Sequence, residues 1–401
     1  MGVLATQLLL LAASISQAQV VKELNHFPQS PLQPVLFNHA APTISSDHVL
    51  GNTTDTDTDF HVFSSKSFAR GRGISIITTH DQMAHFNKLE PLAADVNDMS
   101  SPPFTEHEIP GKGRGLVASK FIHRGDRIFA ETPILIISSE LYEKHEDDPH
   151  VIPAKLRLAV EKLPPAAQGK FWDLHGQTVH NAYSGRIDPN AFDITIQDQQ
   201  YCAVTPDTAR INHDCRPNAG YYFDQHTLTH YVHALTDITP GTEISITYIS
   251  AEMPRHRRKN RLLSTWGFNC TCSSCSLSKH ASRVSDERLA QIFKFQEMFE
   301  GEGWTTQSSG TVEAFLSLID QEKMYNPHGA ALEAAALVYC AEGRYWDTIK
   351  YAYLAEEMLM LEGEDARVEV MRLLTADPTV QKCWRMRAAM KSGKVVWDQI
   401  D

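Results

Sequence analysis

The chain has 401 residues, which is enough for two domains with tails. Hydrophobic residues make up 42% of it and charged residues 21%, the balance of a soluble globular protein. The formal net charge is -12, so the surface as a whole should repel nucleic acid. The charge argues against direct DNA or RNA binding and is compatible with a basic protein or peptide as partner.

The N-terminus resembles a secretory signal peptide. Leu8 to Ala13 form a short apolar run, and Ser16-Gln17-Ala18 supplies the small residues that a signal peptidase recognises, with cleavage expected after Ala18. The positive charge that usually precedes such a run is missing, so an apolar tail is the alternative. The run is too short to cross a bilayer, and no other stretch approaches about 18 apolar residues, so we expect no membrane span.

Residues 19–103 are expected to be largely disordered. Asn52 to Asp59 is a polar tract, and prolines and histidines are scattered through the whole segment. Gly71 to Ile77 is the exception, because its alternating apolar residues could form a short strand or a local pairing element.

From Phe104 the pattern changes to short β-strands. Strand signals occur at Arg127–Pro133 and Ile134–Ile137, and they return between Tyr201 and Tyr248. Between these groups, about Pro153 to His175 has helical spacing.

The C-terminal part is predicted to be helical from about Ser285 to Lys391, with leucine, alanine, methionine and glutamate at helical spacing. The basic run Arg255 to Arg261 that precedes it is interpreted as the solvated face of a helix, with a nucleic-acid patch as the alternative. The fold class is therefore α+β, a β-rich domain followed by an α-helical one.

The cysteines favour a metal site over a secreted disulfide framework. Seven are present, none of them in the first 201 residues, and Cys270, Cys272 and Cys275 lie within six residues. Zinc binds four thiolates tetrahedrally, so a fourth ligand must come from elsewhere, and Cys215 in a polar loop is the candidate. The remaining three are expected to be small buried apolar residues: Cys202, Cys340 and Cys383.

Four segments in this order resemble the SET-domain protein-lysine methyltransferases. They are a glycine-rich loop at Gly111–Leu116, the block Arg210–Asn218, the strand Glu243–Tyr248 and the post-SET segment Trp266–Cys275. The resemblance implies the SET fold, in which small curved sheets surround a threaded, pseudoknot-like C-terminal segment. It also implies S-adenosyl-L-methionine and Zn2+ as cofactors and a protein with a target lysine as substrate.

The resemblance assigns roles to individual residues. Tyr248 would be catalytic, with its hydroxyl orienting the amine; the alternative is a strand-end tyrosine whose hydroxyl lies in water. Cys215, Cys270, Cys272 and Cys275 would bind the metal. The cofactor would be bound by residues for which a plain loop, surface or core role is the alternative: Lys112, Gly113, Arg114, Asn181, Asn212, His213 and Phe268.

Two features depart from the family pattern. Asp214 stands where the family usually has serine, and it adds a negative charge that would either weaken cofactor binding or point outward. No zinc-finger MYND insert is visible, so the chain resembles the MYND-less, SMYD-like fungal branch, whose members often carry a helical C-terminal domain.

The expected organisation follows in chain order: a signal peptide at 1–18, a largely disordered region at 19–103, a SET domain at 104–250 with a helical insert near 150–180, a post-SET zinc segment at 251–280 and a helical domain at 281–401. We expect a monomer. The signal peptide suggests the secretory pathway, whereas the family resemblance suggests the nucleus or cytoplasm. The alternative function is a non-catalytic, zinc-stabilised interaction module of SET type, in one version a secreted one.

Overall fold

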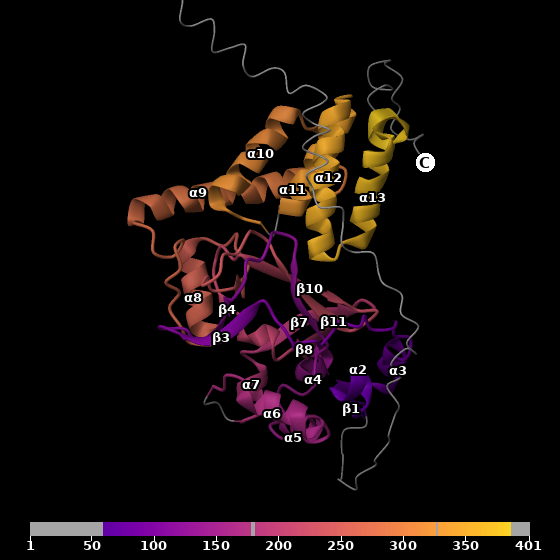
Figure 1. Cartoon of the computed structure of the whole chain (residues 1–401), viewed down its shortest axis with the longest axis vertical. Helices are drawn as coiled ribbons and strands as arrows, with labels where there is room; N and C mark the ends of the chain where they lie inside the picture. The colour runs from indigo at the N-terminus through magenta and orange to yellow at the C-terminus, as the bar shows by residue number, and fades with distance from the viewer. Residues whose placement is uncertain (1–58, 178–180, 326–327, 386–401) are drawn as a thin grey trace, which may run out of the picture. The chain divides into compact units, whose positions relative to one another are not determined.

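The computed structural model describes residues 59–177, 181–325 and 328–385 (Figure 1). All of them belong to one compact unit, Ala40–Asp401. The predicted signal peptide at 1–18 and the expected disorder of 19–58 lie outside the described residues. None of the described helices is long and apolar enough to cross a membrane.

A five-stranded sheet has the strand order β1-β2-β6-β8-β7. Its strands are His61–Ser65 (β1), Ile74–Thr78 (β2), Leu135–Ser138 (β6), Gln199–Val204 (β8) and Ala191–Ile196 (β7). All pairs are antiparallel except β2 with β6, which is parallel. Every residue of β2 is buried, because Ile74 and Ile76 face one apolar cluster and Ile77 faces another.

Residues 59–103 differ from the disorder expected for them. They supply β1 and β2 as well as the short helices α2 (Phe68–Gly71), α3 (His80–Met83) and η1 (Ala84–Asn87). Phe63, Phe68 and Phe86 are buried in the sheet's apolar cluster. Histidines and serines separate these aromatic residues and give the segment a polar composition, although its core positions are apolar. The strand suggested for Gly71 to Ile77 is confirmed as β2.

Three smaller sheets carry the segments with family motifs. β3 (Phe104–Ile109) pairs with β4 (Gly113–Ala118), and β10 (Ala219–Asp224), β11 (Thr229–Ala234) and β5 (Arg127–Glu131) form a three-stranded sheet. β9 (Asn212–His213) pairs in parallel with β12 (Ser245–Ile246). The Ile244 N–H also donates to the Leu116 carbonyl at 2.8 Å. The segment before Tyr248 is thereby held between β4 and β9.

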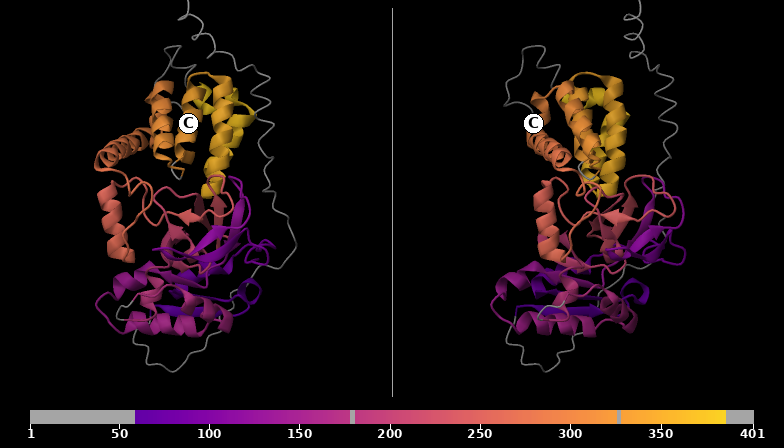
Figure 2. Two further views of the ribbon diagram at one scale, coloured as in Figure 1. Left: turned by 60° about the vertical axis from the view of Figure 1, so that its left-hand side comes forward. Right: turned by 90° about the vertical axis from the view of Figure 1, so that its left-hand side faces the viewer.

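A helical insert between β6 and β7 confirms the helix expected near residues 150–180. It comprises α4 (Ser139–Lys144), α5 (Val151–Glu161), α6 (Pro165–Asp173) and α7 (Ser184–Ile187). Pro165 occupies the first turn of α6, where its missing N–H costs no hydrogen bond. The magenta helices α5 and α6 lie beside the sheet at the foot of Figure 2, and they share a buried cluster with its residues.

The C-terminal part is helical up to residue 385, as predicted, and the remainder of the predicted helical domain, 386–401, lies outside the described residues. Its helices are α8 (Arg255–Trp266), α9 (Lys279–Phe299), α10 (Ser309–Glu322), α11 (His328–Ala341), α12 (Tyr345–Glu362) and α13 (Asp365–Ala376), with short turns η3 (Gly303–Thr306) and η4 (Pro378–Val380). The alanine-rich α11 is the most buried of these helices, because small side chains allow α10 and α12 to approach it closely.

Cys340 and Cys383 correct one expectation. They form a disulfide between α11 and the segment after η4, instead of two separate apolar positions. Both are buried, and 43 residues separate them in sequence, so only the return of the chain after η4 brings them together. Cys202 remains a free cysteine.

Candidate active site

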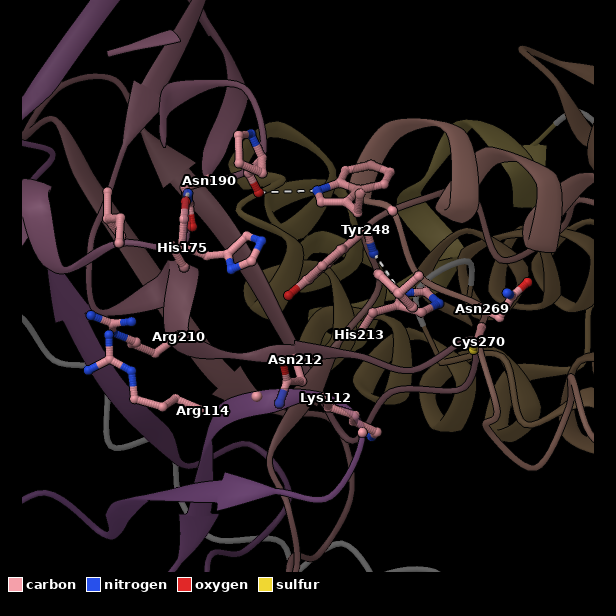
Figure 3. A pocket seen from close by; sticks show the side chains of 18 of the residues that line it. Lys112, Arg114, His175, Asn190, Arg210, Asn212, His213, Tyr248, Asn269 and Cys270 are labelled. Atoms are coloured by element: carbon pink, nitrogen blue, oxygen red, sulfur yellow. Dashed lines mark hydrogen bonds between the residues drawn. The ribbon is translucent and has the colours of Figure 1, made fainter. Parts of the chain in front are cut away.

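One cavity of about 480 Å³ brings together the glycine-rich loop (Gly111–Leu116), the Asn-His block (Arg210–Asn218) and the cysteine segment (Trp266–Cys275). Figure 3 shows Tyr248 between His175 on one side and His213 on the other. Seven of the eight residues proposed as catalytic or cofactor-binding line this cavity: Lys112, Gly113, Arg114, Asn212, His213, Tyr248 and Phe268. The fold thus collects side chains that are up to 156 residues apart in the chain (268 − 112).

The glycine-rich loop is a tight turn between β3 and β4. Gly111 and Gly113 have φ angles of +76° and +75°, which L side chains rarely adopt, and the Lys112 N–H closes the turn on the Ile109 carbonyl. Gly115 has a different reason to be glycine, because a Cβ there would lie 2.4 Å from Asn212 Nδ2. The loop therefore lies directly against the Asn-His block.

Glu243 joins these two motifs. Its carboxylate accepts from Lys112 Nζ at 2.6 Å and from Asn212 Nδ2 at 3.0 Å. Both donors are thereby oriented before any ligand arrives. From the sequence, Glu243 was only the start of a predicted strand, since its position in the motif gives no sign of this role.

Arg114 belongs to an ionic cluster at one side of the cavity. Its guanidinium pairs with Asp173, the last residue of α6, and Arg210 pairs with the same carboxylate. The hydrogen bond from Arg114 is the main reason why the pKa of Asp173 lies below its ordinary value. Asp173 and Arg210 both line the cavity; Arg210 begins the Asn-His block, whereas no sequence motif included Asp173.

Tyr248 is held at both its backbone and its hydroxyl. The hydroxyl donates to the Ile211 carbonyl at 2.7 Å, which differs from the water-exposed hydroxyl of the alternative interpretation. Burial raises the pKa of Tyr248 well above its ordinary value, so the phenol keeps its proton. The Tyr248 N–H donates to His213 Nδ1 at 3.0 Å.

His213 connects the tyrosine to the cysteine cluster. Because Nδ1 accepts from Tyr248, the ring proton is on Nε2, which faces Cys215 Sγ at 3.3 Å. Burial lowers the pKa of His213 to about 4, so the ring is neutral near pH 7. A neutral imidazole with one defined tautomer holds the Tyr248 backbone N–H on one side and the Cys215 sulfur on the other at a fixed separation.

The four predicted metal ligands converge. The sulfur atoms of Cys215, Cys270, Cys272 and Cys275 all lie within 4.8 Å of one another, and all four residues are buried. Cys215 Sγ and Cys275 Sγ are 3.6 Å apart, too far for a disulfide. Zn–S bonds of about 2.3 Å in a tetrahedron place ligand sulfurs about 3.8 Å apart, so these residues fit a zinc ion.

Arg258 is the exception within the basic run Arg255–Arg261. That run was expected to be a solvated helix face, but Arg258 is only 1% exposed and donates to Ser274 Oγ inside the cysteine loop. A four-thiolate zinc site carries two negative charges in excess, and a buried guanidinium beside it offsets part of that charge.

Two further sequence expectations have clear placements. Asp214 does not line the cavity; its carboxylate accepts from the Arg216 N–H at 2.8 Å and closes its own turn. Asn181 does not line the cavity either, because its side-chain oxygen caps α7 by accepting from the Tyr183 N–H at 2.7 Å. Several cavity residues were not foreseen from sequence, among them His175, Asn190 and Asn269.

A second cavity, of about 760 Å³, lies against the first. The two share a wall made of Pro189, Asn190, Ala209, Tyr248 and Trp266. Trp266 Nε1 donates to the Pro189 carbonyl at 3.1 Å and fixes one side of this wall. Tyr248 can therefore be reached from two directions.

The family model described as SET domain matches residues 113–249. This chain contains a SET domain. The match contains the loop from Gly113 onward, the Asn-His block and Tyr248, whereas Lys112 and the cysteine segment, which also line the cavity, lie outside it.

Curated relatives agree with this assignment. The SET-domain chain is 33% identical over 185 residues to "Histone-lysine N-methyltransferase set5" of Schizosaccharomyces pombe, covering 46% of this chain and 54% of that protein. It is 38% identical over 79 residues to "Protein-lysine N-trimethyltransferase SMYD5" of Mus musculus, covering 19% of each. It is also 32% identical over 110 residues to "N-lysine methyltransferase SMYD2" of Homo sapiens, covering 26% and 24%. The chain spans about half the length of the first of these relatives, and less of the others.

Proposed function

We propose that the protein transfers a methyl group from S-adenosyl-L-methionine to the side-chain amine of a lysine in a protein substrate. The observation that carries the proposal is the wall shared by two cavities, with Tyr248 in it. One cavity can hold the methyl donor and the other can admit a lysine, so the two reactants would meet at Tyr248. The names of the relatives support the same reaction.

The cofactor fits the smaller cavity. About 480 Å³ is within the usual range for small-molecule sites. Lys112 and Arg114 provide positive charge for a carboxylate, and Asn212 and His213 would bind the amino-acid and adenosine portions. Phe268 would pack on the adenine. When bound, S-adenosyl-L-methionine supplies the methyl on a cationic sulfur.

The larger cavity would present a lysine without its proton. Free lysine has a pKa near 10.4, so neutralising it at pH 7 costs about 4.6 kcal/mol, which is about 3.4 units at 1.36 kcal/mol each. The shared wall is mostly apolar or aromatic, and the donor beyond it is cationic. Both features disfavour an ammonium ion and lower the amine's pKa. The Tyr248 hydroxyl, fixed on the Ile211 carbonyl, would orient the amine for an in-line approach.

The zinc ion would act as a structural element. The cysteine cluster joins the Asn-His block to the segment that carries Phe268, so the metal would hold together two sides of the cofactor cavity.

Tyr248→Phe tests the proposal. We expect kcat for a lysine peptide to fall by a factor on the order of 100 or more, because an oriented hydroxyl at the reacting atoms is removed. The Kd for S-adenosyl-L-methionine, measured by calorimetry, should stay within about threefold. Tyr353→Phe, an exposed tyrosine on α12, is the matched control and should keep full activity. A wild-type protein that binds no cofactor would favour a non-catalytic interaction module instead.

A further inference from the structure

The larger cavity has an acidic outer part. Three carboxylates line it, those of Glu143, Asp188 and Asp193, and Arg261 on α8 is the one cationic side chain among the described residues that line it. The three acidic residues are exposed, and none of their carboxylates forms an ion pair or a hydrogen bond with another described residue. These negative charges are therefore available to a ligand.

Asp188 and Asp193 act on the same part of the cavity. Asp193 lies directly across from Cys202 in the β7–β8 pair. Burial raises the pKa of Cys202 to about 12, and the charges of both Asp193 and Asp188 add to that shift. The two carboxylates therefore lie close enough to one thiol to combine their fields.

The acidic part is close to the shared wall. Asp188 directly precedes Pro189, and Asp193 is three residues after Asn190. Consecutive Cα atoms are about 3.8 Å apart, so both aspartates are at most three residues along the chain from a residue of the wall that contains Tyr248. An extended peptide advances about 3.3 Å per residue. If the side chain of a substrate lysine extends to the wall at Tyr248, the residues next to that lysine in the substrate peptide would lie beside Asp188 and Asp193.

The cavity has features for such a ligand besides charge. Tyr142 lines it, and its hydroxyl is buried without a hydrogen-bond partner among the described residues. Buried polar atoms in folded proteins nearly always have partners, so this hydroxyl is suited to a group that enters from outside. Phe192 and Tyr221 add aromatic surface on which a cationic side chain can rest.

We infer that this cavity selects an extended peptide segment in which an arginine or a second lysine lies within about three residues of the target lysine, and that Asp188 and Asp193 are the residues that select it. The inference rests on the proposed methyl transfer and names its substrate class. The net charge of -12 favours the same kind of partner, because a basic segment is attracted to the whole molecule.

Paired peptides test the inference. One has the target lysine between arginines, and the other has alanines at those positions. For the wild type we expect kcat/KM to be about tenfold or more higher for the arginine peptide, mainly through KM. In the double variant Asp188→Asn/Asp193→Asn that preference should largely disappear, whereas activity on the alanine peptide should change by less than about twofold. Glu146→Gln removes an exposed carboxylate near Glu143 that does not line the cavity, so it should leave the preference unchanged.

Charge reversal keeps the test decisive. Asp188→Lys should favour a peptide with glutamates beside the target lysine over the arginine peptide. Cofactor binding by each variant, measured by calorimetry, shows that the protein is folded. If both variants bind cofactor and methylate the arginine peptide as the wild type does, the inference is overturned while methyl transfer stands. If no peptide of either kind is methylated by the wild type, the proposed function fails, and the inference fails with it.

Discussion

Gly115 has no room for a side chain, because a Cβ would lie 2.4 Å from Asn212 Nδ2 and 2.9 Å from an Ile109 side-chain carbon. Gly115→Ala should therefore push Asn212 away from Glu243. We expect a loss of about 1–3 kcal/mol in the free energy of unfolding, typical of overpacking. Because Asn212 lines the cofactor cavity, calorimetry should also show at least about tenfold weaker binding of S-adenosyl-L-methionine.

Gly169→Ala is the matched control for that change. Gly169 lies in α6, and a Cβ there meets nothing within 4 Å. Alanine should stabilise the helix by about 0.5–1 kcal/mol and leave cofactor binding unaltered. Equal effects of the two substitutions would contradict the packing argument at Gly115.

His230 should make stability depend on pH. It is 1% exposed, and burial lowers its pKa to about 3 from an ordinary value of 6.5. The folded state favours the neutral ring, so this contribution is complete above pH 6.5 and is lost as the pH falls toward 3. The loss approaches about 1.4 kcal/mol per pH unit.

His230→Phe should remove that contribution. The ring lies between Phe192 and Tyr221 in edge-on contacts that phenylalanine can keep, whereas the hydrogen bond between His230 Nδ1 and Thr205 Oγ1 is lost at both pH values. Urea unfolding at pH 7.5 and pH 5.5 should show a smaller loss of stability on acidification for the variant than for the wild type. Identical losses would mean that His230 is protonated without cost, contrary to its burial.

At the scale of elements, α10 is tied to the Asn-His block by a buried ion cluster. Glu322, in the last turn of α10, pairs with Arg216 next to Cys215 and with Arg288 on α9. Burial alone would raise the pKa of Glu322, but hydrogen bonds from Arg216, Ser285 and Arg288 hold it below its ordinary value. The helical part is thus connected to the loop that carries a predicted metal ligand.

Glu322→Ala would leave Arg216 buried without a counter-charge. We expect a loss of about 3–5 kcal/mol in the free energy of unfolding, measured by urea titration. Glu287→Ala is the control, because Glu287 pairs with Arg283 on the exposed face of α9 and should cost less than about 0.5 kcal/mol. Similar losses for both would show that the buried cluster contributes little.

Elements with a regular period or a dense motif were predictable from the sequence. The helices after residue 279 follow the 3.6-residue spacing, and the sulfur atoms of the cysteine triplet and Cys215 converge as expected. The strand β1 was missed because its two apolar residues, Val62 and Phe63, are adjacent and flanked by His61, Ser64 and Ser65, so the sequence shows no alternation of apolar and polar residues.

Residues that act through distant partners gave no sequence signal. Asp173 and Asn190 reach the 480 Å³ cavity through partners distant in sequence, because Asp173 pairs with Arg210 and Asn190 Nδ2 donates to the His175 carbonyl. Asn181 was proposed from a local motif alone, yet its side chain caps α7. A motif predicts which residue types occur together, but helix placement decides which of them face the cavity.

For the molecule as a whole, two cysteine-based constraints of different chemistry act on different regions. The cysteine cluster, with four free sulfurs, joins the Asn-His block to the segment after α8. The Cys340–Cys383 disulfide closes a separation of 43 residues that contains α12 and α13. A chelator and a reductant should consequently loosen different parts of one chain.

Reduction should affect the helical region first. Closing a loop of 43 residues is worth about 4 kcal/mol in the chain-entropy treatment, so a reductant or Cys383→Ser should increase amide hydrogen exchange in α12 and α13. Cofactor affinity should change by less than about twofold. A chelator should instead increase exchange around Cys215 and Cys270 and abolish cofactor binding, because those segments form one side of the cavity. If the chelator left the exchange around Cys215 unchanged, the cluster would not hold a structural metal, and the stability of that side of the cavity would have to come from Arg258 and apolar packing alone.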